Sequence, residues 1–272
     1  MAGGLARIEP WGPSRGRRGK RAAALRKVVR ELREPRRARV FLRELTLFVA
    51  LYGNGPESSH RLRIRPLDDL LPGAGSQIPC LAHRLDDRSL PYAEAYVLAQ
   101  LVRQLRPGRL FEIGTYTGAG SRILLQNAAP QAHLFTLDLP LAGDSMHLSG
   151  LSLDPPTDPG EVGREFRDAP IAGRITQLWG DSATFDFTPY WGSIDLVFVD
   201  GAHSYDYVKS DSAAAVRLLA PGGVIVWDDC ARHFPGLVLA LDEVAREVPI
   251  SVIKGTRLAV HISAPHISAP EG

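Results

Sequence analysis

Short apolar runs that end in acidic residues alternate along the chain with stretches of helical spacing. Two of these runs are residues 196–199, which precede Asp200, and residues 224–227, which precede Asp228. The segment between them, residues 206–219, has helical character. A strand–helix–strand unit of this kind is right-handed, and its two strands are parallel. The acids that follow the two runs are therefore expected at one edge of a sheet, where open α/β sheets bind ligands.

The same alternation covers most of the chain and predicts about seven strands, with helices between the first five. The expected strands are residues 109–114, 133–137, 174–179, 196–199, 224–227, 250–253 and 258–262, and the expected helices are 91–105, 121–127, 206–219 and 237–248. The last two strands are joined by a short turn, so they must be antiparallel. The sequence therefore predicts an α/β fold with a doubly wound, mostly parallel seven-stranded sheet, an antiparallel last strand and a helical N-terminal extension.

The extension differs in charge from the rest of the chain. Residues 1–43 contain 14 Lys and Arg and 3 acidic residues, which gives a net charge of +11. The other 229 residues contain 18 Lys and Arg and 27 acidic residues, which gives a net charge of −9. We divide the chain into a basic arm with one or two amphipathic helices (1–77), a main domain (78–263) and a tail (264–272). The arm could bind nucleic acid, a membrane surface or a partner subunit. We favour packing on the domain or contacts in a homo-oligomer over nucleic-acid binding, because the apolar stripes of the arm need burial.

Composition narrows the class of protein further. The 272-residue chain has two cysteines, Cys80 and Cys230, too few for a disulfide framework, and a reducing, cytoplasmic location is expected. No apolar run approaches the roughly 18 residues of a membrane-spanning helix, so no span is predicted. Residues 139–163 form a long insertion rich in Gly, Pro and Asp, which is typical of a lid or a binding loop.

A glycine-rich turn, in the stretch E-I-G-T-Y-T-G-A-G-S, joins the first strand of the main domain to the next helix. Glycine lets the backbone approach a ligand closely, and the start of a helix offers N–H groups. The spacing of Gly114, Gly118 and Gly120 does not fit the dinucleotide pattern G-x-G-x-x-G, which disfavours a dehydrogenase. The stretch also lacks the lysine of a phosphate-binding loop. The turn therefore favours a nucleotide-like ligand of another kind.

Acidic residues at the ends of the first two strands define that ligand more closely. Asp138 follows the second strand, where an acid can accept both hydroxyls of a ribose. Glu112, at the end of the first strand, could hold a cationic amino group. Both acids have structural alternatives, because Glu112 could pair with a nearby arginine and Asp138 could cap the next turn. A ligand with an amino-acid moiety and a ribose but no phosphate, such as S-adenosylmethionine, suits this pair best.

From about residue 78 to 263 the layout resembles a class I S-adenosylmethionine-dependent methyltransferase. The stretch E-I-G-T-Y-T-G is similar to the first motif of catechol-type O-methyltransferases. D-G-A-H followed by D-D is similar to the metal-dependent sugar O-methyltransferases of macrolide and aminocoumarin antibiotic pathways. The resemblance implies that the cofactor is held by Glu112, Gly114, Tyr116, Gly118 and Asp138, with adenine near Asp181 and Ser182.

Three carboxylates, Asp200, Asp228 and Asp229, are expected together at the ends of the strands that carry D-G-A-H and D-D. Like charges a few ångströms apart raise one another's pKa unless a cation neutralises them. Mg²⁺ is a hard cation that binds a few carboxylates and substrate oxygens. We therefore expect these acids to be metal ligands. The alternative is that one of the last two caps the following segment and no metal binds.

His203 lies three residues after Asp200 and is the expected catalytic base. An imidazole accepts a proton near neutral pH, and a substrate hydroxyl on a metal needs only a weak base. The alternatives are a metal ligand or a hydrogen-bonded loop residue. Catechol-type enzymes have Lys at this place and Asn at that of Asp229, so the resemblance is nearer to the sugar-modifying group.

The expected function is a Mg²⁺-dependent O-methyltransferase that acts on a small hydroxylated molecule, a sugar of a natural product or another polyol or phenol. One alternative keeps the fold without methyl transfer, as a partner in a hydroxylation complex or a non-catalytic subunit. The other makes the basic arm primary, as a binder of nucleic acid or of an anionic membrane. The stretch D-P-P-T at 154–157 is similar to a signature of base-modifying methyltransferases, but it does not follow the strand that ends at Asp200, where that signature belongs.

Overall fold

The computed structural model describes residues 62–73, 90–139, 148 and 159–263, together with positions 33, 38, 39, 42 and 46. The described residues leave out nearly all of the predicted N-terminal helices, most of the 139–163 insertion and the tail.

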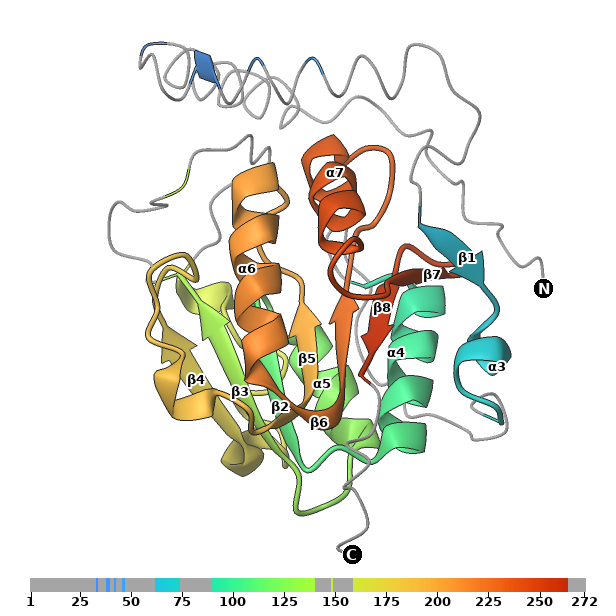
Figure 1. Cartoon of the computed structure of the whole chain (residues 1–272). Helices are drawn as coiled ribbons and strands as arrows, with labels where there is room; N and C mark the ends of the chain where they lie inside the picture. The colour runs from blue at the N-terminus through green and yellow to red at the C-terminus, as the bar shows by residue number, and fades with distance from the viewer. Residues whose placement is uncertain are drawn as a thin grey trace, which may run out of the picture.

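One mixed sheet forms the centre of the described structure, with strand order β1-β7-β8-β6-β5-β2-β3-β4 (Figure 1). The strands are β1 (Arg63–Arg65), β2 (Arg109–Ile113), β3 (His133–Asp138), β4 (Ile175–Trp179), β5 (Ile194–Val199), β6 (Leu219–Trp227), β7 (Ser251–Ile253) and β8 (Ala259–Ile262). Only β8 runs against its neighbours in the described sheet, since it pairs antiparallel with both β6 and β7. The predicted fold class, doubly wound and mostly parallel with an antiparallel last strand, is confirmed.

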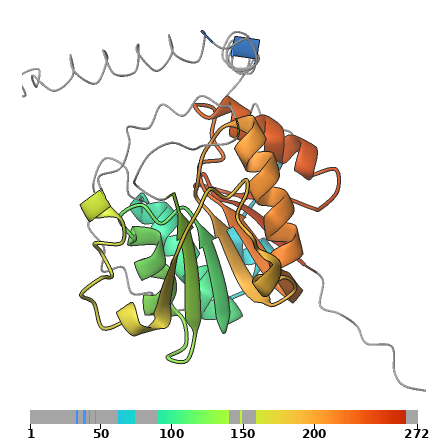
Figure 2. The same cartoon turned by 90° about the vertical axis from the view of Figure 1, so that its left-hand side faces the viewer.

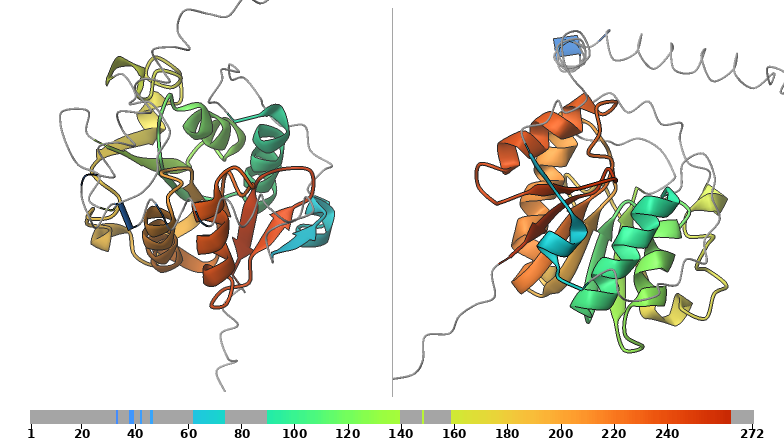
Figure 3. Two further views of the ribbon diagram at one scale, coloured as in Figure 1. Left: turned by 90° about the horizontal axis from the view of Figure 1, so that it is seen from above. Right: turned by 90° about the vertical axis from the view of Figure 1, so that its right-hand side faces the viewer.

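Helices cover both faces of this sheet (Figures 2 and 3). The helices are α3 (Leu67–Leu70), α4 (Tyr92–Leu105), α5 (Ala119–Asn127), α6 (Tyr205–Leu218) and α7 (Pro235–Val244), and the 3-10 turns are η2 (Pro159–Glu161), η3 (Ala172–Arg174) and η4 (Thr188–Tyr190). Successive strand residues point to opposite faces, and this alternation supplies both cores. Leu196 and Phe198 of β5 belong to the core under α4 and α5, whereas Val197 and Val199 belong to the core under α6 and α7.

The eighth strand, β1, is one more than the sequence analysis expected. It comes from residues placed in the arm and pairs parallel with β7. Its three residues are too short for an alternation, and two of them are arginines. The side chain of Ile64, between them, is 51% exposed, as at the outer strand of a sheet. Pairing with β7, rather than burial, therefore defines this strand.

The central unit β5–α6–β6 follows the prediction closely, with its two strands parallel. Strand β6 begins at Leu219, several residues earlier than expected, and the register between the strands shifts between Ile194 and Leu196. Both strands end at one edge of the sheet: the Asp200 N–H donates to the carbonyl of Ile113 (2.8 Å), and the Asp228 N–H donates to that of Val199 (3.0 Å).

Within the described part of the chain, every helix is too short or too polar to cross a bilayer.

Candidate active site

The glycine-rich turn between β2 and α5 has a backbone that requires glycine at two positions. Gly114 has φ +99° and Gly118 has φ +85°. A Cβ at Gly114 would overlap the carbonyl oxygen of Asp200, and one at Gly118 would lie 2.5 Å from the ring of Phe166. The turn therefore packs against the end of β5 on one side and against the segment after η2 on the other. Tyr116 also has a positive φ, 44°.

Asp138 holds the start of this turn. Its Oδ2 accepts a hydrogen bond from the Tyr116 N–H (2.7 Å), and its Oδ1 accepts one from the Leu139 N–H (2.7 Å). Burial raises the pKa of Asp138 despite these backbone hydrogen bonds. The acid predicted to bind a ribose thus lies directly beside the predicted cofactor turn.

Glu112 lies beneath the turn and is fully buried. Its carboxylate accepts hydrogen bonds from the hydroxyls of Ser121 on α5 and Thr136 on β3. A Cβ at Gly120 would lie 2.5 Å from Glu112 Oε1, which explains the third glycine. Burial raises the pKa of Glu112 to about 7. Its hydrogen bonds link β2, β3 and α5, and its direct contact with a cofactor stays a prediction.

Asp181 and Ser182 follow β4, on the other side of Asp138. Asp181 Oδ2 accepts a hydrogen bond from the Tyr207 hydroxyl (2.7 Å), and Oδ1 accepts one from the Ala183 N–H (2.9 Å). Asp211 is fully buried on α6, and burial raises its pKa to about 7 against a lowering influence of the nearby Ser182.

The sequence analysis did not single out Tyr207 and Asp211. Both lie on the buried side of α6, at positions i and i+4. The sequence did contain a signal for Asp211: this acid occupies a position that continues the apolar stripe of the predicted helix.

Two predicted metal ligands and the predicted base meet at the ends of β5 and β6. One ligand atom each of Asp200, His203 and Asp229 lies within 4.8 Å of the other two. We call these three residues the Asp–His cluster. Asp228 falls outside this group: it is buried, and its Oδ1 accepts a hydrogen bond from the Asp229 N–H (2.7 Å). His203 Nε2 lies 3.0 Å from Asp229 Oδ2.

Negative charge dominates the electrostatics of this region. Burial, followed by the charges of Asp228 and Asp229, holds the pKa of Asp200 well above its ordinary value. Burial and Asp229 raise the pKa of Asp228 to about 7. Because neighbouring carboxylates disfavour the ionisation of Asp200 and Asp228, the region has the electrostatics of a cation site.

Two further side chains at the cluster were not predicted. Arg257, in the turn between β7 and β8, places Nη1 2.6 Å from Asp229 Oδ1. The ring of Phe234, just before α7, packs on the imidazole of His203 with 4.2 Å between centroids. Neither lies near Asp200 in sequence, and an arginine in a hairpin turn is ordinarily a solvent-exposed residue.

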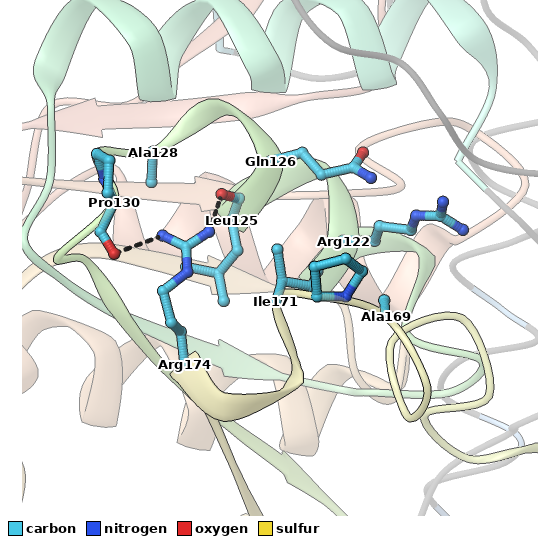
Figure 4. A pocket seen from close by; sticks show the side chains of 9 residues that line it. Arg122, Leu125, Gln126, Ala128, Pro130, Ala169, Ile171 and Arg174 are labelled. Atoms are coloured by element: carbon cyan, nitrogen blue, oxygen red, sulfur yellow. Dashed lines mark hydrogen bonds between the residues drawn. The ribbon is translucent and has the colours of Figure 1, made fainter.

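A separate pocket of about 510 Å³ lies between the end of α5 and the segment before β4 (Figure 4). Arg174 crosses it and donates to the carbonyl of Leu125 (2.7 Å), in the last turn of α5, and to that of Ala129 (2.8 Å), just after the helix. Arg122, at the other side of the pocket, pairs with Glu165 (3.2 Å). None of the predicted site residues lines this pocket, and its arginines have structural partners, so we do not assign the active site to it.

Comparison with known proteins shows which class of enzyme this chain resembles. The sheet order and the antiparallel β8 are those of a class I methyltransferase fold, and residues 111–230 match the family model of a methyltransferase domain. The chain is therefore similar to class I methyltransferases in fold and over the matched residues, and the resemblance seen in the motifs is confirmed. No curated protein matches the sequence.

Solved structures resemble the chain at low identity, and the first of them shows the same fold. The S-adenosylhomocysteine-bound methyltransferase PaMTH1 of Podospora anserina is 19% identical, with 73% of this chain and 87% of that chain covered and a TM-score of 0.50. The O-methyltransferase TomG from Streptomyces achromogenes, involved in tomaymycin synthesis and solved with S-adenosylmethionine, is 18% identical, with 84% and 98% covered and a TM-score of 0.49.

Proposed function

We propose that this protein is an S-adenosylmethionine-dependent O-methyltransferase that uses Mg²⁺ and methylates a hydroxyl group of a small molecule. One observation carries the proposal: the glycine turn and the Asp–His cluster are in direct contact, because Gly114 packs against the Asp200 carbonyl so tightly that no side chain fits between them. A cofactor held by the turn lies next to the cluster.

The cofactor end suits a ribose and an adenine without phosphate. A carboxylate offers about four acceptor positions, so the backbone bonds to Asp138 leave capacity for ribose hydroxyls. Asp181 and Ser182 lie at the end of the next strand, where adenine would bind. The acids at this end disfavour a phosphorylated ligand.

The donor set of the Asp–His cluster fits a hard divalent cation. Two carboxylates and an imidazole converge within 4.8 Å, and the raised pKa values of Asp200 and Asp228 come from burial and then from neighbouring carboxylates, Asp229 among them in both cases. Asp200, Asp229 and the nearby Asp228 would hold the ion. When bound, Mg²⁺ supplies positive charge that lowers the pKa of a substrate hydroxyl.

His203 is the proposed base, and Nε2 is the nitrogen directed at the cluster. Its neighbour Asp229 orients the imidazole, and the ring of Phe234 packs against it. The neutral imidazole takes the proton of the substrate hydroxyl at the ring nitrogen that does not donate to Asp229. S-adenosylmethionine, when held by the turn, would supply the methyl group to the substrate oxygen, with an O–C bond formed as the C–S bond of the sulfonium breaks. The products are the methyl ether and S-adenosylhomocysteine.

A screen of purified protein with S-adenosylmethionine, Mg²⁺ and a panel of sugars and phenols tests the proposal. We expect methyl transfer to at least one class and its loss in excess chelator. Cofactor binding without transfer to any polyol or phenol would instead favour a methyltransferase fold that serves as a non-catalytic partner. Full activity in excess chelator would remove the metal from the mechanism.

His203→Ala separates the two roles that remain for the imidazole. A base is needed for proton transfer but not for ion binding, so we expect the variant to retain Mn²⁺ affinity while its methylation rate falls about 10²- to 10⁴-fold. Loss of Mn²⁺ binding would identify His203 as a ligand instead.

A further inference from the structure

Arg257 connects the Asp–His cluster to a helix at the other end of the sequence. Its Nε and Nη2 donate to Glu94 Oε1 (2.9 Å) and Oε2 (3.0 Å), a bidentate pair. Its backbone N–H also donates to Glu94 Oε1 (3.0 Å). Glu94 is 3% exposed and lies in the first turn of α4. Three contacts to one buried carboxylate therefore set the direction of the guanidinium.

The remaining side of the guanidinium faces Asp229. Arg257 Nη1 lies 2.6 Å from Asp229 Oδ1, whereas Asp229 Oδ2 faces His203. The two oxygens of Asp229 thus have different neighbours. One is held by the arginine, and the other points into the cluster.

The backbone of Asp229 is unusual and is held from the same turn. Asp229 has φ +59°, a left-handed conformation that costs free energy for a residue with a side chain. The next N–H, that of Cys230, donates to the carbonyl of Arg257 (2.8 Å). Both the backbone after Asp229 and its carboxylate are therefore anchored by Arg257.

We propose that Arg257, fixed by Glu94, is a positioning residue that aligns Asp229 to bind the metal ion. The inference rests on the proposed function, because it concerns the same ion. Carboxylates that bind a metal are ordinarily held by an outer hydrogen bond, and loss of that partner typically weakens metal binding about 10- to 100-fold.

The sign of the effect makes the inference testable. A guanidinium near a cation site repels the cation, so its removal would strengthen metal binding if charge alone mattered. If Arg257 aligns Asp229, its removal weakens metal binding instead. The two explanations predict opposite changes from one substitution.

The experiment titrates the full chain with Mn²⁺, a paramagnetic substitute for Mg²⁺, and measures the free ion by electron paramagnetic resonance. The variants are Arg257→Ala, Arg257→Lys and Glu94→Gln. Arg246→Ala, which removes an exposed arginine beyond α7, is the control for charge. The affinity for S-adenosylhomocysteine is measured for every variant as a test of folding.

We expect Arg257→Ala to raise the Kd for Mn²⁺ about 10- to 100-fold. Arg257→Lys should lose nearly as much Mn²⁺ affinity, because one ammonium group cannot bind Glu94 and Asp229 at the same time. The Kd of Glu94→Gln for Mn²⁺ should lie between those of these variants and that of the wild type. Arg246→Ala should match the wild type, and S-adenosylhomocysteine affinity should stay the same throughout.

Unchanged or tighter Mn²⁺ binding in Arg257→Ala would overturn the inference and leave the proposed function standing. A wild type that binds no Mn²⁺ would remove both the metal and the positioning role. If Arg257→Ala fails to bind S-adenosylhomocysteine, the lysine variant decides: a loss of about tenfold or more supports the inference, and a wild-type Kd contradicts it.

Discussion

The two ends of the candidate site are built in different ways. The cofactor end, which we define as residues 112–121 with Asp138, Asp181 and Ser182, consists largely of one continuous turn and two strand ends. The Asp–His cluster instead combines two loops, and its Asp229 depends on Arg257 and Glu94, which lie 163 residues apart in the sequence. The cofactor end can therefore be read from local sequence, whereas the geometry of the cluster depends on how the whole sheet is assembled.

Asp200→Asn should produce the largest difference between the two ends. It removes a half-buried carboxylate of the cluster without a change in size, so we expect methyl transfer to fall about a hundredfold or more and Mn²⁺ binding to weaken in parallel. S-adenosylhomocysteine affinity should change little. Initial rates measure methyl transfer, and calorimetric titrations measure the affinities for Mn²⁺ and S-adenosylhomocysteine. The exposed Asp168→Asn is the control. Loss of the cofactor affinity would show that the two ends are not separable.

Gly114→Ala should damage both ends at once, because Gly114 belongs to the turn and packs against the Asp200 carbonyl. The added methyl group overlaps that oxygen and the φ of +99° is strained, so we expect a loss of about 2–5 kcal/mol of unfolding free energy. Denaturant unfolding measures it. Gly173→Ala, where a Cβ meets nothing within 4 Å, is the matched control. Equal stability of the two variants would contradict the contact.

Glu112 should make stability depend on pH at the cofactor end. Its folded pKa of about 7 lies above the ordinary 4.5, so the folded state holds a proton that the unfolded state loses first. The contribution of Glu112 to the free energy of unfolding is complete below about pH 4.5. It is lost as pH rises to about 7, by up to about 3 kcal/mol. Glu112→Gln should flatten this part of the stability profile, which thermal unfolding between pH 4 and 8 measures. An unchanged slope would assign the dependence to other acids.

Tyr207→Phe should give the smallest effect, confined to the cofactor end. Without the Tyr207 hydroxyl, Asp181 loses a donor, and we expect S-adenosylmethionine to bind a few-fold more weakly, about 1 kcal/mol, with Mn²⁺ affinity unchanged. Tyr205→Phe is a matched control, because this tyrosine on the same helix donates to Glu243 on α7. A similar loss in both variants would point to a general effect on α6.

Parts of the site differ in how far they could be predicted. The position of Asp200 at a sheet edge follows from an apolar run that ends in an acid, and the structure confirms the parallel pair that places it there. The local turn of Gly114 and Gly118 follows from residue type. The burial of Glu112 beneath that turn was not predictable, because its partners Ser121 and Thr136 become neighbours only when α5 and β3 pack together.

The sequence by itself determined the alternation of strands and helices, the class of the fold and the acids that end its strands, because apolar periodicity and glycine positions are local properties. The tertiary structure decided which of those acids converge: Asp229 turns toward His203, whereas Asp228 accepts a backbone N–H beside it. It also decided the place of Arg257. Contacts between residues so far apart depend on strand order and register, which no local pattern contains.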